Sequence, residues 1–242
     1  MGGSLYSQDL AYIHAVAFGG LAEGAAPEIV RLLKSAEIPI RSVVDAGCGA
    51  GTLSAALVEA GFDVTGIDSS ADLLAIARAA VPRASFVNAS IYDVELPACQ
   101  AIVALGEPLT YHPEGAEADR LLEDWFQRAS TALPPGGLLI FDVIEPGEPS
   151  LAGRFWSSGE DWAVLVHTSE DQPNRALIRT IETFRRVGQL YSRGCEIHRV
   201  HLFETCELSS RLAGCGFAVQ TARAYGAYAL APRRRAFFCT RR

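Results

Sequence analysis

The sequence predicts an α/β fold with a doubly wound, mostly parallel sheet of seven strands. Short apolar runs alternate with helical patterns over 42–143, a glycine-rich turn follows the first run, and an acidic residue closes each of the first two. The chain has 242 residues, of which 49% are hydrophobic and 20% charged. This size suffices for one large core, so we expect a single domain over 1–242.

Two helical patterns, at 9–18 and 28–36, come before the first strand and predict a helical cap within 1–40. The main α/β unit is expected over 41–145. Its strands are predicted at 42–46, 63–67, 85–87, 101–105 and 138–143, and its helices at 52–60, 71–80 and 117–133. Ligands of such sheets bind at the carboxyl ends of the strands.

The segment after the fifth strand has a different pattern. Strand-like runs at 162–168, 176–186 and 189–203 are separated by polar turns, which predicts an antiparallel insertion within 150–203. A helix at 204–213 and strands at 217–222 and 235–240 then return to the main sheet, within 204–242. Aromatic side chains of the insertion, such as Trp156 and Tyr191, could line a pocket or a subunit contact, but packing is the commoner role.

The glycine-rich turn reads Asp45-Ala46-Gly47-Cys48-Gly49-Ala50-Gly51. Glycines let the backbone turn sharply and approach a ligand, because no Cβ stands in the way. A dinucleotide-binding turn needs a third glycine where Thr52 stands, so a nucleotide-dependent oxidoreductase is disfavoured.

A second carboxylate, Asp68, ends the second predicted strand. It is suited to accept hydrogen bonds from both hydroxyls of a ribose. Its alternative role is the N-cap of the following helix, but Ser69 or Ser70 can cap that helix while Asp68 binds.

The D-x-G-x-G-x-G order resembles motif I of class I S-adenosylmethionine-dependent methyltransferases. Further landmarks of that family follow in order at 88–90, 104–107, 133–137 and 213–217. The runs at 9–14 and 101–107 look like those of bacterial small-molecule methyltransferases. The resemblance implies the strand order of this class, with the last strand antiparallel, and S-adenosyl-L-methionine as the cofactor.

The resemblance also implies the cofactor-binding residues. Many relatives carry Asp where this chain has Ser90, a neutral and weaker acceptor for the adenine amino group. Asp93 is an alternative adenine contact or a turn residue, and Ile91 and Leu105 would enclose the ring. The full set is Asp45, Gly47, Cys48, Gly49, Gly51, Asp68, Ser69, Ser90, Ile91, Leu105 and Gly106.

Methyl transfer by in-line displacement depends mainly on positioning. Where the acceptor must lose a proton, the candidate bases are His14, Glu107, Tyr111 and His112. For His14 a structural role is equally plausible, and for His112, which precedes Pro113, a structural role in the loop is favoured. The rival hypothesis is a non-catalytic module that binds S-adenosylmethionine.

Composition narrows the partners. The net charge of -7 disfavours nucleic acid. The 6 cysteines include no C-x-x-C pair, and His198 and His201, three apart on a predicted strand, face opposite sides, so we predict no metal. The sequence shows neither a leader nor a run long enough to span a membrane, which predicts a cytoplasmic protein. We expect a small-molecule substrate, no membrane partner, and a monomer or homodimer.

Overall fold

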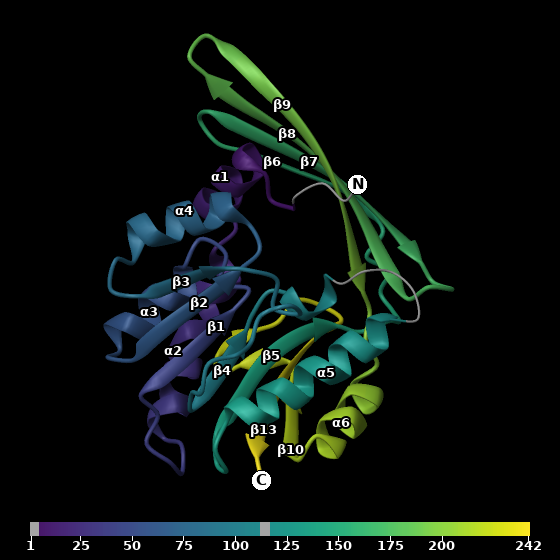
Figure 1. Ribbon diagram of the computed structural model, residues 1–242. Helices are drawn as coiled ribbons and strands as arrows, with labels where there is room; N and C mark the ends of the chain where they lie inside the picture. Colours follow the sequence, from purple (N-terminus) through teal and green to yellow (C-terminus); the bar gives the residue numbers. More distant parts are fainter. Residues whose placement is uncertain (1–4, 112–116) are drawn as a thin grey trace.

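The computed structural model describes residues 5–111 and 117–242. Its main sheet has seven strands in the order β10-β13-β5-β4-β1-β2-β3 (Figure 1). β13 pairs antiparallel with both β5 and β10, whereas the pairs among β1 to β5 are parallel. The strands are β1 (Ser42–Ala46), β2 (Asp63–Asp68), β3 (Ser85–Asn88), β4 (Ala101–Ala104), β5 (Leu138–Ile144), β10 (Phe217–Ala222) and β13 (Arg234–Arg241). The predicted fold class is confirmed.

Helices cover both faces of this sheet, because apolar side chains of successive strand residues alternate between the faces. Val44 packs in the cluster of α5 and α6, and Val43 packs in the cluster of α2 and α3. The helices are α1 (Gln8–Ala17), α2 (Gly20–Lys34), α3 (Thr52–Glu59), α4 (Ala71–Ala80), the short η1 (Pro108–Thr110), α5 (Glu117–Ala132) and α6 (Thr205–Gly214).

A second, four-stranded antiparallel sheet is inserted between β5 and α6 and extends beyond the core (Figure 1). Its strands are β6 (Gly153–Ser158), β7 (Trp162–Asp171), β8 (Ala176–Val187) and β9 (Leu190–His201). One face packs on α1, where Leu10 and Ile13 meet Val164 and Ile181. The N-terminal helix therefore lies between the insertion and the core.

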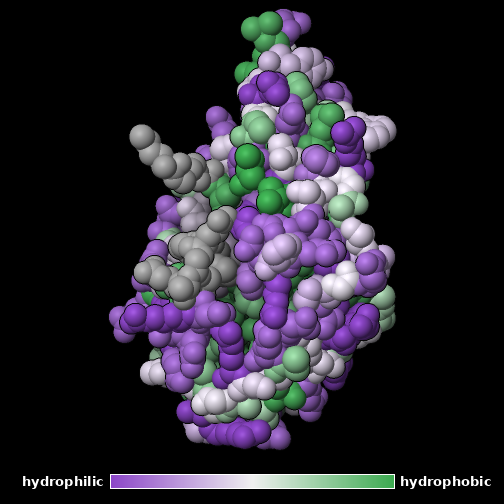
Figure 2. Space-filling view, turned by 90° about the vertical axis from the view of Figure 1, so that its right-hand side faces the viewer, coloured by the Kyte–Doolittle hydropathy of each residue, from purple (hydrophilic) through white to green (hydrophobic). Residues whose placement is uncertain are grey.

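Exposed hydrophobic side chains include Trp156, Leu190 and Ile197, all on this second sheet. Figure 2 shows hydrophobic patches among hydrophilic residues on the projecting part of the molecule. Among the helices within the described residues, none is both long and apolar enough to cross a membrane.

Three elements differ from the prediction. α2 begins at Gly20 rather than at residue 28, and Gly24 lies inside it. A Cβ on Gly24 would lie 2.1 Å from the Tyr228 ring, so this glycine permits close packing instead of ending a helix. Strand β6 and the short hairpin of β11 (Ala224–Tyr225) and β12 (Tyr228–Ala229) were not predicted, since each is short or polar in pattern.

Candidate active site

A cavity lies where β1, β2 and β4 end, and α1 and the residues before it form its other wall. Every residue predicted to bind the cofactor lines this cavity except Gly51. The opposite wall is largely apolar and aromatic, and includes Leu5, Tyr6, His14, Phe18 and Tyr111. The cavity thus has a carboxylate-bearing end and an aromatic end.

The glycine turn forms the floor of this cavity. Gly47 has φ +75° and Gly49 has φ +53°, values that favour glycine. A Cβ on Gly47 would lie 2.3 Å from Cβ of Pro108, so the turn fits closely against η1. The N–H of Gly49 donates to Oδ2 of Asp68 at 2.9 Å, which ties the turn to the end of β2.

Gly51 has a different role. It precedes α3 with φ +84°, and a Cβ there would lie 3.1 Å from Cβ of Ala77. The absence of a side chain therefore lets α3 start against α4. Gly51 itself does not line the cavity.

Two carboxylates end neighbouring strands and face the cavity. Asp45, only 2% exposed, accepts a hydrogen bond from Oγ of Ser54 at 2.6 Å, and burial raises its pKa to about 7. Asp68 accepts from the N–H groups of Gly49 and Ser70, yet burial still raises its pKa. Ser70 caps α4 by accepting from the N–H of Leu73, which leaves Asp68 available for a ligand.

Ser90 and Ile91, which follow β3, and Leu105, which follows β4, line the cavity. Oγ of Ser90 accepts from the N–H of Tyr92 at 3.1 Å and has a further lone pair for a ligand donor. Asp93 is exposed in a turn and does not line the cavity, in accord with its alternative role as a turn residue.

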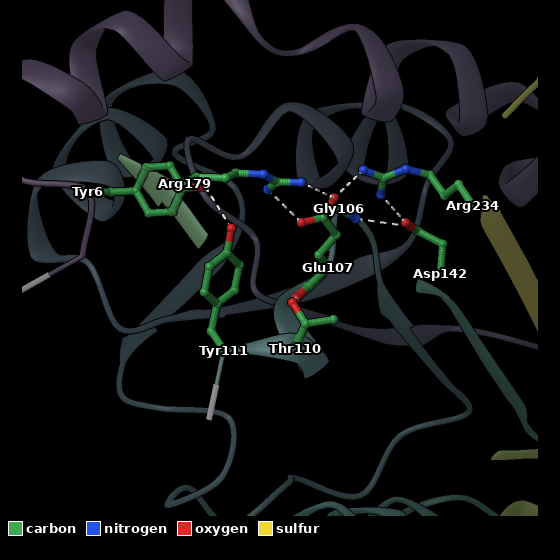
Figure 3. A network of polar contacts seen from close by, with 8 residues as sticks. All are labelled: Tyr6, Gly106, Glu107, Thr110, Tyr111, Asp142, Arg179 and Arg234. Atoms are coloured by element: carbon green, nitrogen blue, oxygen red, sulfur yellow. Dashed lines mark hydrogen bonds and ion pairs between the residues drawn. The ribbon is translucent and has the colours of Figure 1, made fainter. Parts of the chain in front are cut away.

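Two of the four candidate bases, His14 and Tyr111, line the aromatic end. Burial, and next the nearby His198, lower the pKa of His14, so its imidazole is neutral at pH 7. Nδ1 of His14 is buried and has no hydrogen-bond partner among the described residues. Burial raises the pKa of Tyr111, whose hydroxyl lies 3.5 Å from that of Tyr6, so Tyr111 is a neutral phenol (Figure 3).

Glu107 is placed differently from its predicted role as a base. It is 3% exposed, does not line the cavity, and binds Arg179 of β8 and Arg234 of β13 (Figure 3). Burial alone would raise the pKa of Glu107, but the two guanidinium groups lower it. Glu107 is therefore ionised and a poor proton acceptor.

The same network holds the loop after β4. Arg234 also pairs with Asp142, and Oδ1 of Asp142 accepts from the N–H of Gly106 at 2.9 Å. Charged groups from β5, β8 and β13 therefore fix Gly106, a residue of the cavity wall.

Several predicted residues lie elsewhere. His112 falls outside the described residues. Trp156 and Tyr191 of the insertion are exposed and do not line the cavity. Tyr6 lines the cavity although the sequence did not indicate it, because an isolated tyrosine near the N-terminus carries no motif. Within residues 5–111 and 117–242, no group of three or more His, Cys, Asp or Glu is arranged to hold a metal ion.

Comparisons with known proteins agree with this geometry. Residues 43–137 match the model of a methyltransferase domain family. The curated relative YqeM of Bacillus subtilis, which carries a methyltransferase name, is 27% identical over 183 residues, 72% of this chain and 72% of that protein. Matches to ubiquinone biosynthesis O-methyltransferases are shorter. The match to the enzyme of Colwellia psychrerythraea spans 41% of that protein's length.

Solved structures share the fold over nearly the whole chain. An S-adenosylmethionine-dependent methyltransferase from Clostridium acetobutylicum superposes with a TM-score of 0.81 at 16% identity, covering 96% of this chain and 97% of that one. A sugar N-methyltransferase from Streptoalloteichus gives 0.77 at 22% identity, covering 100% and 94%.

Residues 43–137 thus resemble a methyltransferase domain, and the chain has the fold of class I S-adenosylmethionine-dependent methyltransferases. The cofactor of this class is S-adenosyl-L-methionine, and the cavity residues fit it. The two carboxylates suit its cationic and ribose groups. The glycines of the turn have no side chains, so the cofactor can approach the backbone there.

Proposed function

We propose that the protein transfers the methyl group of S-adenosylmethionine to a small molecule bound at the aromatic end of the cavity. The observation that carries this proposal is that the cavity has two chemically distinct ends, with carboxylates at one and Tyr6, His14 and Tyr111 at the other. A donor and an acceptor can therefore meet within it.

At the carboxylate end, Asp68 would accept the two ribose hydroxyls and Asp45 the ammonium group of the cofactor. Each oxygen of Asp68 has one backbone donor and can accept another hydrogen bond. Ile91 and Leu105 would enclose the adenine, with Ser90 as its hydrogen-bond acceptor. When bound, S-adenosylmethionine supplies a methyl group on a cationic sulfur, already activated for transfer.

At the aromatic end, the chain's own residues orient the acceptor and remove its proton. His14 is neutral at pH 7, so a ring nitrogen can take a proton from an amine or hydroxyl. Tyr6 and Tyr111 offer hydroxyls that can orient the acceptor. Glu107 is no longer proposed as a base, because its charge is already paired.

The choice of acceptors for a first test follows from the relatives. One structural neighbour methylates a sugar nitrogen and other relatives methylate oxygen in ubiquinone biosynthesis, as their names state. Amino sugars and phenols are therefore the first classes to test. The likeness to the sugar enzyme extends over the whole chain, the insertion included.

The experiment incubates the protein with methyl-labelled S-adenosylmethionine and these acceptor classes, then a metabolite extract, and detects labelled product and S-adenosylhomocysteine by mass spectrometry. The Asp68→Ala variant is the control for cofactor-independent label. Tight binding of S-adenosylhomocysteine without any labelled product would favour a non-catalytic binding module over the proposed transfer.

A further inference from the structure

The two residues before α1, Tyr6 and Ser7, form a strap that joins the two halves of the cavity wall. On one side the strap is bonded to Glu196 of β9, in the insertion sheet. On the other, the carbonyl of Tyr6 accepts a hydrogen bond from Oγ of Ser70 at 2.9 Å. Ser70 lies two residues after Asp68, so the strap reaches the cofactor end of the cavity.

Glu196 is the centre of the first attachment. Its Oε2 accepts from the N–H of Tyr6 at 2.7 Å, and its Oε1 accepts from the N–H and the Oγ of Ser7 at 2.8 and 2.6 Å. Nε2 of His198 lies 2.8 Å from Oε2. Burial alone would raise the pKa of Glu196, but these hydrogen bonds lower it to about 2. The group is therefore an anion that only accepts, and Nε2 of His198 is the donor.

The strap holds Tyr6 in a costly conformation. Tyr6 has φ +54°, a left-handed value that disfavours residues with a Cβ. Such a conformation persists where tertiary contacts impose it. Here those contacts are the two backbone hydrogen bonds of Tyr6, to Glu196 and from Ser70.

The strained backbone directs the Tyr6 ring into the cavity. Its centroid lies 5.0 Å from that of His14 and 4.9 Å from that of His198, both in edge-to-face geometry. Figure 3 shows the Tyr6 ring pointing toward the hydroxyl of Tyr111. The ring thus packs between the candidate base and the insertion sheet.

We propose that Glu196 is a positioning residue that latches the Tyr6–Ser7 strap across the cavity, so that the strap retains the cofactor and its product during each turnover. This role rests on the proposed function, since it concerns the ligand of the same cavity. Glu196 does not line the cavity and acts through Tyr6. Exchange of the product for fresh cofactor then requires the strap to leave Glu196.

The test compares Glu196→Gln with the wild type, using S-adenosylhomocysteine as the probe. An amide offers one acceptor oxygen where the carboxylate offers two, so the hydrogen bonds to either Tyr6 or Ser7 are lost. Because hydrogen bonds to charged groups are strong, release measured by stopped flow should be about tenfold faster, with association changed far less. Hydrogen exchange of the N-terminal peptide holding Tyr6 and Ser7 should also accelerate.

Glu182→Gln is the matched control, because Glu182 lies on β8 of the same sheet but pairs with the exposed Arg193 at 2.7 Å. It should leave both measurements at the wild-type values. Ser7→Ala removes one of the three strap donors to Glu196 and should give a smaller increase in release. It also provides a folded test if Glu196→Gln unfolds.

Wild-type release rates in folded Glu196→Gln, or in Ser7→Ala if the first variant unfolds, would overturn the latch while leaving the proposed function intact. Failure of the wild type to bind S-adenosylhomocysteine would instead overturn the proposed function, and the latch with it.

Discussion

Arg179 of the insertion sheet forms a two-bonded ion pair with Glu107 of the core, with Nη1 to Oε2 at 2.9 Å and Nη2 to Oε1 at 3.3 Å. The pair joins segments 72 residues apart in sequence. Glu107 has φ +76°, so the pair also anchors a strained turn directly after Gly106.

Arg179→Met should destabilise the fold, because it leaves the buried carboxylate of Glu107 with Arg234 alone. We expect a loss of about 2 to 4 kcal/mol in the free energy of unfolding, measured in urea. Arg193→Met, which breaks the exposed pair with Glu182, should cost far less, because solvent screens exposed ion pairs. Equal losses in the two variants would show that the buried pair adds no particular stability.

Asp68→Ala should weaken S-adenosylhomocysteine binding by about 1 to 3 kcal/mol in calorimetry, since charged hydrogen bonds to the ribose would be lost. Asp68→Asn keeps one acceptor oxygen and should bind with intermediate affinity. Unchanged affinity in both variants would refute the ribose assignment.

Cofactor affinity should depend on pH through Asp45, whose pKa burial raises from 3.8 to about 7. As the pH falls below 7, Asp45 takes up a proton and loses its attraction for an ammonium group. Affinity for S-adenosylhomocysteine should therefore rise on the order of tenfold from pH 5.5 to 7.5, below the titration of the ligand's own amino group.

The control for this pH series is Asp45→Asn, in which the affinity for S-adenosylhomocysteine should depend less on pH. It need not vanish, because burial also raises the pKa of Asp68. The stability of the fold should change with pH in the opposite direction to the affinity. The folded state binds the Asp45 proton more tightly than the unfolded state, so the contribution of Asp45 to stability decreases as the pH rises from about 4 to 7. An undiminished slope in Asp45→Asn would assign the pH dependence to other groups.

Gly47→Ala should impair both folding and cofactor binding, because the new Cβ would lie 2.3 Å from Cβ of Pro108 and the residue has φ +75°. Gly61→Ala isolates the backbone effect, since Gly61 has φ +96° and a Cβ added there would meet no atom of the described residues within 4 Å. Gly61→Ala should cost about 1 kcal/mol of stability and leave calorimetric affinity unchanged. If Gly47→Ala lost no more stability or affinity than Gly61→Ala, Pro108 would have to move aside without cost, and the close contact would not matter.

The main sheet was predictable because each of its first five strands is a short apolar run followed by turn chemistry. Asp45 and Asp68 were predictable for a related reason, since each ends such a run and lies at the rim where parallel strands end. Helix α2 was predicted too short because Gly24 resembles a helix breaker, and its packing against Tyr228 depends on a contact across most of the chain.

The polar contacts between distant segments were beyond sequence reasoning. Glu107 looked like a base because it follows the fourth strand, but its partners Arg179 and Arg234 lie on two later strands. Tyr6 and Glu196 are 190 residues apart, and neither belongs to a local pattern. Periodicity and capping describe neighbours in sequence, so they do not report such pairs.

Most of the aromatic end of the cavity comes from residues that precede the segment matching the domain family, and the insertion supports this end from outside through Glu196. Substitutions in 5–18 could thus change the acceptor over evolutionary time while the donor site stays constant. Arg179 and Glu196 would resist such divergence, because each also secures a part of the cavity wall that any acceptor would need.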